Sequence, residues 1–154
     1  MKLLLILILV TYSFSELYSI GPEEVLQKLK EGNERFVTGQ SIHPNIDKDR
    51  IKNTATEGQK PIATVLACSD SRSPVEILFD QGVGDLFVIK VAGNVADVDE
   101  IATIEYGTAH LLTPVLIVLG HTKCGAVTAV ATNAELHGHL PKLVDNIQPA
   151  FEKA

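Results

Sequence analysis

One stretch of this sequence carries the strongest structural signal, Ala67-Cys68-Ser69-Asp70-Ser71-Arg72. It follows the apolar, β-rich run 62–66 and precedes a helix-start signal at residues 73–76. A thiol, a carboxylate and a guanidinium therefore lie in one short turn at the carboxyl end of a predicted buried strand. In open α/β sheets, binding and chemistry collect at the carboxyl ends of the strands.

A second stretch has the same organisation. The apolar run 115–120 predicts another strand, which leads directly into His121-Thr122-Lys123-Cys124-Gly125. If the two strands are neighbours in a parallel sheet, Cys68, His121 and Cys124 converge at one edge of it.

Length and composition limit the class of protein. The chain has 154 residues, which is about one domain, and its hydrophobic content of 45% argues against a disordered chain. The formal net charge is −6 and there is no run of basic residues. Neither nucleic acid nor an anionic lipid surface is therefore expected as a partner.

The N-terminus predicts export. Lys2 is followed by the apolar run Leu3–Val10, which suits the core of a signal peptide and is too short to span a bilayer. We expect residues 1–19 to be a signal peptide and residues 20–154 to form the domain. The protein is then periplasmic or secreted, with no stable membrane insertion after the signal is removed.

The rest of the chain alternates between helical and strand patterns. Helices are predicted over Pro22–Val37, over Ser73–Asp80 with Ser73 and Glu76 as a capping box, from Asp97 to about Leu112, over Gly125–Glu135, and around Leu143 to Ile147 with an interruption at Pro149. Strands are predicted over Ile62–Ala67, Leu86–Val91 and Val115–Leu119, and residues 38–59 are expected to be a loop. This order is typical of an α/β fold with a small parallel β-sheet and flanking helices.

Two features of the sheet are unusual. The second strand is apolar on both faces except for Lys90, a pattern typical of a central parallel strand. Three strands make a small sheet, and the third would leave an exposed edge. We therefore expect the domain to be incomplete at its C-terminus, as a fragment or with a part supplied by a partner.

Two thiolates and one imidazole form a ligand set suited to zinc, and two cysteines and one histidine with an open fourth position make a catalytic set. A structural zinc site uses four Cys or His ligands, and no fourth such residue has a suitable local spacing. His137 and His139, among Gly and Pro, are expected to be exposed turn residues. The fourth position then belongs to Asp70 or to water. The alternative for the two cysteines of an exported chain is a disulfide.

Asp70 and Arg72 are two residues apart on the predicted turn, and a guanidinium pairs with a carboxylate in a planar fork. Such a pair would keep Asp70 ionised and turned away from the metal. In the simpler interpretation the pair only stabilises the turn. In the functional interpretation Asp70 accepts a hydrogen bond from hydroxide at the metal and orients it.

Together these residues resemble the β-class carbonic anhydrases. The resemblance rests on Cys-Ser-Asp-Ser-Arg at 68–72 with His-Thr-Lys-Cys-Gly at 121–125, a highly specific pair of motifs. Supporting stretches are residues 29–36, residues 85–88, Gly93-Asn94 and Ile104-Glu105-Tyr106. The resemblance covers nearly everything from about Ile20 to Ala154.

The resemblance implies that Cys68, His121 and Cys124 bind Zn²⁺ and that Asp70 and Arg72 form the catalytic carboxylate–guanidinium dyad. It implies reversible hydration of carbon dioxide to bicarbonate and a proton. Three alternatives remain open: a zinc hydrolase of carbonyl sulfide or carbon disulfide, a catalytically inactive zinc-binding subunit, and a thiol enzyme with Cys124 as nucleophile. The thiol enzyme would leave Cys68 and the dyad without a role.

The resemblance also implies a substrate pocket. Gln59 would hydrogen-bond the substrate, Tyr106 would lie near the site, and Phe87 and Ala92 would line the pocket. In the family, the first helix packs on a second subunit and the pocket forms at the dimer interface. A homodimer or higher homo-oligomer is therefore expected, in which Gln59, Phe87 and Tyr106 serve the neighbour's zinc. Lys90 stands where the family usually has arginine, and family members continue for another helix and strand or more.

Overall fold

The computed structural model describes residues 20–154, so the predicted signal peptide lies outside the described residues. The strands are β1 (Ala63–Cys68), β2 (Leu86–Val91) and β3 (Leu116–Leu119). The helices are α1 (Pro22–Val37), α2 (Lys48–Glu57), α3 (Val75–Leu78), η1 (Ala92–Asn94), α4 (Val98–Glu105), η2 (Tyr106–His110), α5 (Gly125–Ala131), α6 (Leu140–Asp145) and α7 (Gln148–Phe151). Among these residues, no helix has the length and apolar character needed to cross a membrane.

The three strands form one parallel sheet in the order β2-β1-β3, which confirms the predicted α/β class. All six residues of β1 are buried, so β1 is the central strand. The expectation that the second strand is central was wrong: within residues 20–154, β2 pairs only with β1, and its Lys90 is exposed. The exposed edge of the third strand is present, with Val118 62% exposed.

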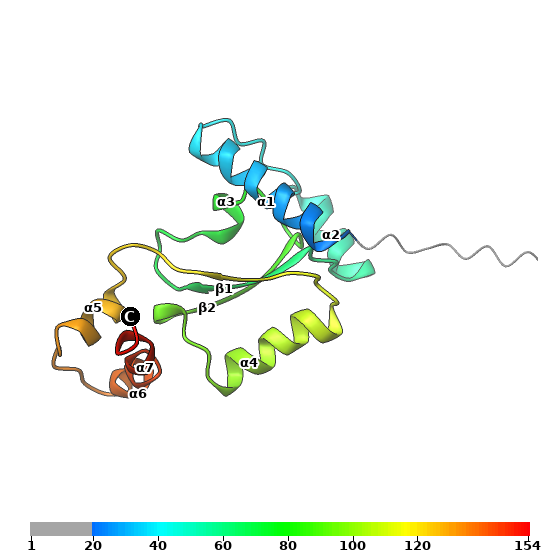
Figure 1. The fold of residues 1–154 in the computed structure, drawn as a ribbon. Helices are drawn as coiled ribbons and strands as arrows, with labels where there is room; N and C mark the ends of the chain where they lie inside the picture. Colours follow the sequence, from blue (N-terminus) through cyan, green and yellow to red (C-terminus); the bar gives the residue numbers. More distant parts are fainter. Residues whose placement is uncertain (1–19) are drawn as a thin grey trace, which may run out of the picture.

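The sheet is covered on both faces (Figure 1). Helices α1 and α3 lie over one face, α4 lies over the other, and α5 to α7 gather beyond the strand ends. The main core consists of β1, α1 and α3 side chains, among them Val25, Leu29, Val65 and Val75. The predicted amphipathic helix over Pro22–Val37 is therefore confirmed residue for residue.

Helix α1 is fixed to the turn after α3 by an ion pair between the partly exposed Arg35 and the buried Asp80. The Asp80 side chain is fully buried, accepts a hydrogen bond from Arg35 Nε at 2.6 Å, and accepts the backbone N–H groups of Ile42 and His43 at 3.1 and 2.9 Å. Burial alone would raise the pKa of Asp80, but these hydrogen bonds lower it below its ordinary value.

Helix α2 contradicts the loop predicted over residues 38–59. Asp47 caps its N-terminus by accepting the Arg50 N–H at 2.8 Å. Arg50 also fixes the helix to the body of the protein, because its Nε donates to the carbonyl of Val83 at 2.8 Å and its Nη2 to Asp85 at 3.1 Å. No residue of α2 is buried, so the helix has no apolar stripe that periodicity would reveal.

The capping box predicted at Ser73 and Glu76 is also wrong. Helix α3 begins at Val75, after Pro74, without a side-chain hydrogen bond at its cap. The predicted helix from Asp97 is confirmed, and its cap is a capping box between Asp97 and Glu100.

The later helices are shorter than predicted. After α4 the chain continues as the π-helical turn η2, which ends at His110. Leu112, the predicted last residue of this helix, has a positive φ of 58°. Helix α5 ends at Ala131, not at residue 135. The C-terminal break lies between α6 and α7, and Pro149 belongs to the first turn of α7 rather than to the break.

Candidate metal centre

The parallel register brings the two predicted motifs together. Ala67 in β1 is paired with Leu119 in β3, so both strands end at the same edge of the sheet. Cys68 is the last residue of β1, His121 follows β3, and Cys124 is the N-cap of α5. Ligand atoms of these three residues all lie within 4.8 Å of one another.

The two cysteines of this cluster are buried and unbridged. Cys68 and Cys124 are 4% and 8% exposed, and their Sγ atoms are 3.9 Å apart. The N–H of Gly93 donates to Cys68 Sγ at 3.3 Å. Burial alone would raise the pKa of Cys68, but the Asp70 and Gly93 backbone and the adjacent side chains of His121 and Cys124 lower it to about 7. The site therefore favours the thiolate, which is the form that binds metals.

His121 offers the cluster an unpartnered ring nitrogen. Its Nδ1 lies 3.0 Å from the carbonyl of Thr122, which accepts a hydrogen bond from an Nδ1–H and leaves Nε2 with a free lone pair. Nε2 is buried and is the one buried side-chain nitrogen or oxygen in residues 20–154 without a hydrogen-bond partner. Contact with Cys68 raises the pKa of His121 above its ordinary value. Two sulfurs and an unpartnered imidazole nitrogen fit Zn²⁺.

Asp70 and Arg72 form the predicted dyad. Arg72 Nε donates to Asp70 Oδ1 at 2.9 Å and Nη2 to Oδ2 at 2.8 Å, while the Arg72 backbone N–H also reaches Oδ1 at 2.9 Å. These hydrogen bonds hold the pKa of Asp70 far below its ordinary value. Asp70 Oδ2 lies 3.7 Å from His121 Nε2, so the ionised carboxylate borders the ligand cluster while both of its oxygens are bound by Arg72.

Arg72 also joins the two motifs. Its Nη2 donates to the carbonyl of Lys123 at 3.3 Å and lies 3.4 Å from His121 Nδ1. Lys123 itself has a positive φ of 55°, an uncommon conformation for a residue with a side chain. The loop after β3 is thus shaped so that both His121 and Cys124 face Cys68.

The four predicted pocket residues fall into two groups. Ala92 follows Val91, which is paired with Cys68, so Ala92 is at the metal edge of the sheet. Phe87 is paired with Thr64, near the opposite ends of the strands. The ring of Tyr106 lies 5.7 Å from that of Phe87, and Tyr106 and Gln59 line the same cavity of about 610 Å³.

The second group is therefore distant from the metal centre of its own chain. Thr64 and Cys68 are four residues apart in β1, which corresponds to about 13 Å along an extended strand. Gln59 is exposed, and Tyr106 is 46% exposed.

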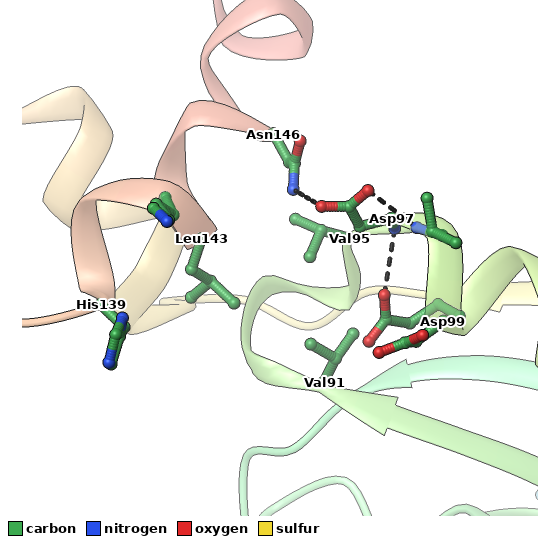
Figure 2. A pocket seen from close by; sticks show the side chains of 10 residues that line it. Val91, Val95, Asp97, Asp99, His139, Leu143 and Asn146 are labelled. Carbon is green, nitrogen blue, oxygen red and sulfur yellow. Dashed lines mark hydrogen bonds between the residues drawn. The ribbon is translucent and has the colours of Figure 1, made fainter.

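A second cavity, of about 440 Å³, lies beyond the end of β2 (Figure 2). Its acidic lining caps α4: Asp97 accepts the Val98 N–H, Glu100 accepts the Asp97 N–H, and Asn146 donates to Asp97. His139 lines its rim and is exposed, as is His137, which confirms that these histidines are surface residues.

Three contributors to the site were not predicted from the sequence. They are the Gly93 N–H on Cys68, the Thr122 carbonyl on His121, and a hydrogen bond from Lys90 Nζ to the Ser73 carbonyl at 2.8 Å. The first two are backbone groups, which composition does not reveal. Lys90 was the visible signal, as the one charged residue in an apolar strand.

The comparisons with known proteins agree with this geometry. The sequence profile of the carbonic anhydrase family matches residues 63–154. A carbonic anhydrase of Mycolicibacterium smegmatis is 41% identical over 136 residues, which cover 85% of this chain and 65% of that protein. Carbonic anhydrase 2 of Mycobacterium tuberculosis is 48% identical over 121 residues, which cover 79% of this chain and 58% of that protein.

The fold has the same relatives. A structure described as one of two tetrameric β-carbonic anhydrases of Sordaria macrospora superposes with a TM-score of 0.62 at 22% identity, covering 83% of this chain and 64% of that one. The chain belongs to the carbonic anhydrase family, and its fold is that of the β class. It spans about three fifths of the length of the curated relatives that it matches.

Proposed function

We propose that this chain carries the zinc site of a β-class carbonic anhydrase and catalyses the reversible hydration of carbon dioxide to bicarbonate and a proton. One observation carries the proposal: Cys68, His121 and Cys124 offer ligand atoms within 4.8 Å of one another, beside a carboxylate that a guanidinium holds in place. A thiol enzyme would use Cys124 and His121 but would leave Cys68 and Asp70 without a role.

Zn²⁺ would be held by the two thiolates and by Nε2 of His121. When bound, the ion acts as a Lewis acid that makes water a nucleophile near neutral pH. The Thr122 carbonyl fixes the tautomer of His121, and the Gly93 N–H stabilises the Cys68 thiolate. These backbone contacts preorganise the ligands before the ion arrives.

Asp70 would act on the attacking water. Because Arg72 satisfies both carboxylate oxygens, Asp70 stays ionised and is kept from taking a metal position itself. It can still accept one hydrogen bond from the water and thereby turn a lone pair of that water toward the carbon of the substrate. Arg72 is the residue that keeps Asp70 in this role.

The pocket would be completed by a second copy of the chain. Ala92 would form part of the apolar wall at its own metal centre, and such a wall suits an uncharged linear molecule. Gln59, Phe87 and Tyr106 would serve the metal centre of the neighbouring subunit, because Phe87 lies at the end of the strands remote from Cys68, about 13 Å along β1. Tyr106 packs on Phe87, and Gln59 lines the same cavity as Tyr106. The name of the Sordaria macrospora relatives, tetrameric β-carbonic anhydrases, supports a homo-oligomer.

We also propose that the protein is exported. Support comes from the sequence of residues 1–19, in which a lysine precedes an apolar run of signal-peptide length. N-terminal sequencing of the protein from its native compartment tests this proposal. A mature chain that still begins at Met1 would contradict cleavage.

Stopped-flow measurement of carbon dioxide hydration tests the activity. Zinc-loaded protein should accelerate hydration well above the buffer rate, and His121→Ala, which lacks one ligand, should bind zinc poorly and be inactive. Zinc bound at one ion per chain without hydration would favour the inactive-subunit alternative. Faster turnover of carbon disulfide than of carbon dioxide would favour the sulfur hydrolase.

A further inference from the structure

The turn that carries the dyad has little packing of its own. Ser69, Ser71 and Arg72 are exposed, and the side chain of Arg72 is 56% exposed even with its carboxylate partner. Its internal bonds are the Asp70–Arg72 fork and the Ser73 N–H donating to the Asp70 carbonyl at 3.0 Å. Outside the turn, Arg72 Nη2 donates to the carbonyl of Lys123 at 3.3 Å. The position of the dyad relative to the metal ligands therefore depends on this one long contact and on how the two ends of the turn are fixed.

Both ends are fixed by consecutive residues of β2. At the first end, the Ser69 N–H donates to the carbonyl of Val91 at 3.1 Å. At the second end, Lys90 Nζ donates to the carbonyl of Ser73 at 2.8 Å. The first contact continues the strand ladder and is independent of side chains, whereas the second requires a long side chain with a terminal donor.

Lys90 has no other polar task in the described part of the chain. None of the ion pairs of residues 20–154 involves it. It is paired with the buried Ala67 in a strand that is otherwise apolar. The hydrogen bond to the Ser73 carbonyl is therefore the one polar contact that its ammonium group makes within residues 20–154.

We propose that Lys90 is a positioning residue for the Asp70–Arg72 dyad, acting through the Ser73 carbonyl. The ammonium group holds the far end of the turn against the carboxyl end of β2, and so keeps the carboxylate of Asp70 beside the ligand cluster. This role rests on the proposed function, because the dyad matters for catalysis only if the site hydrates carbon dioxide. Loss of a hydrogen bond from a charged donor of this kind should lower kcat/KM about tenfold, if the reaction depends on the position of the dyad.

The test uses Lys90→Met, which keeps the length and apolar stem but removes the donor, and Lys90→Arg, which restores a donor. Lys153→Met, at the exposed C-terminus, controls for the loss of one surface lysine. Two quantities are measured on the zinc-loaded protein: kcat/KM for hydration, and the NMR signal of the Arg72 Nε–H. The chain has three arginines, so Arg35 and Arg50 provide internal reference signals.

In Lys90→Met, the Arg72 Nε–H should exchange faster with water and change its chemical shift, while the Arg35 and Arg50 signals stay unchanged. The kcat/KM should fall about tenfold with zinc content unaltered, and Lys90→Arg should recover most of both losses. An Arg72 signal identical to wild type in Lys90→Met, or an equal change in Lys153→Met, would overturn the proposal.

Two further results keep the proposal separable from the function and from folding. If the unaltered chain does not hydrate carbon dioxide, the function fails, while the Arg72 signal still decides whether Lys90 orders the turn. If Lys90→Met does not fold, the rate at which the Lys90 ammonium protons exchange with water is measured in the unaltered protein instead. An ammonium group that exchanges as fast as that of Lys153 would contradict the hydrogen bond to Ser73.

Discussion

Gly93 links the fold to the metal centre, and Gly93→Ala is the substitution whose effect the structure defines most closely. The residue has a positive φ of 75°, and its N–H donates to Cys68 Sγ at 3.3 Å. A Cβ at this position would lie 2.7 Å from Cδ1 of Ile147 and 3.0 Å from Cβ of Ala126. The methyl group would therefore meet both a backbone penalty and two packed side chains.

The two penalties can be separated within this chain. Gly39 has almost the same φ, 71°, but a Cβ there would meet nothing within 4 Å. Gly39→Ala should therefore lose only the left-handed backbone term, about 1 kcal/mol of unfolding free energy. Gly93→Ala should lose about 2–4 kcal/mol, because overpacking against Ile147 and Ala126 adds to the same term.

The metal affinity provides a second readout. Moving the Gly93 N–H away from Cys68 should weaken zinc binding about tenfold, whereas Gly39→Ala should bind zinc as the wild type does. Urea unfolding of the metal-free proteins and competition with a chromogenic chelator measure the two effects. Equal stability losses in the two variants, together with unchanged zinc affinity in Gly93→Ala, would refute the roles given to the packing and the N–H group of Gly93.

Three other perturbations have defined outcomes. Arg72→Ala should free Asp70 and abolish hydration while zinc content stays at one ion per chain; loss of zinc together with activity would show that the dyad only supports the fold. Asp80→Asn should destabilise the protein by about 3 kcal/mol at pH 7. The difference in unfolding free energy between the two proteins, measured by urea unfolding, should become smaller below pH 3.8, the ordinary pKa of the carboxyl group. Because the pKa of Asp80 is lowered in the folded protein, its ionised form stabilises the fold above that pH. This stabilisation is lost as the pH falls through the pKa of the folded state. Oxidation of the metal-free protein should join Cys68 to Cys124, because their Sγ atoms are 3.9 Å apart. A thiol assay should then find no free thiol, and the oxidised protein should take up no zinc. The zinc-loaded protein should keep both thiols under the same treatment.

Elements with a buried face were predictable from the sequence. Helix α1 and strand β1 carry apolar side chains at the period that their burial requires, and the structure has them within one residue of the predicted bounds. Helix α2 has no buried residue, so only its capping residue Asp47 marked it in the sequence. The Ser73 and Glu76 pattern resembled a helix cap, but the Ser73 carbonyl is instead the acceptor for Lys90.

The metal centre was predictable because soft ligands at two strand ends are rare and converge in a parallel sheet. Cys68, His121 and Cys124 carry that signal in their side chains. The groups that orient them, such as the Gly93 N–H and the Thr122 carbonyl, belong to the backbone, so any residue type would offer them and only the fold reveals them. The separation of Gln59 and Tyr106 from the cysteines likewise depends on strand register, which the motifs alone do not specify.

X-ray absorption spectroscopy at the zinc edge tests the central claim most directly, that these two cysteines and this histidine hold the catalytic metal. Zinc-loaded protein should show two sulfur neighbours at about 2.3 Å and one imidazole nitrogen at about 2.0–2.1 Å, with a light atom in the fourth position. The sulfur count should fall to one in Cys124→Ser. A first shell of oxygen and nitrogen without sulfur, or a spectrum unchanged by Cys124→Ser, would contradict the assignment.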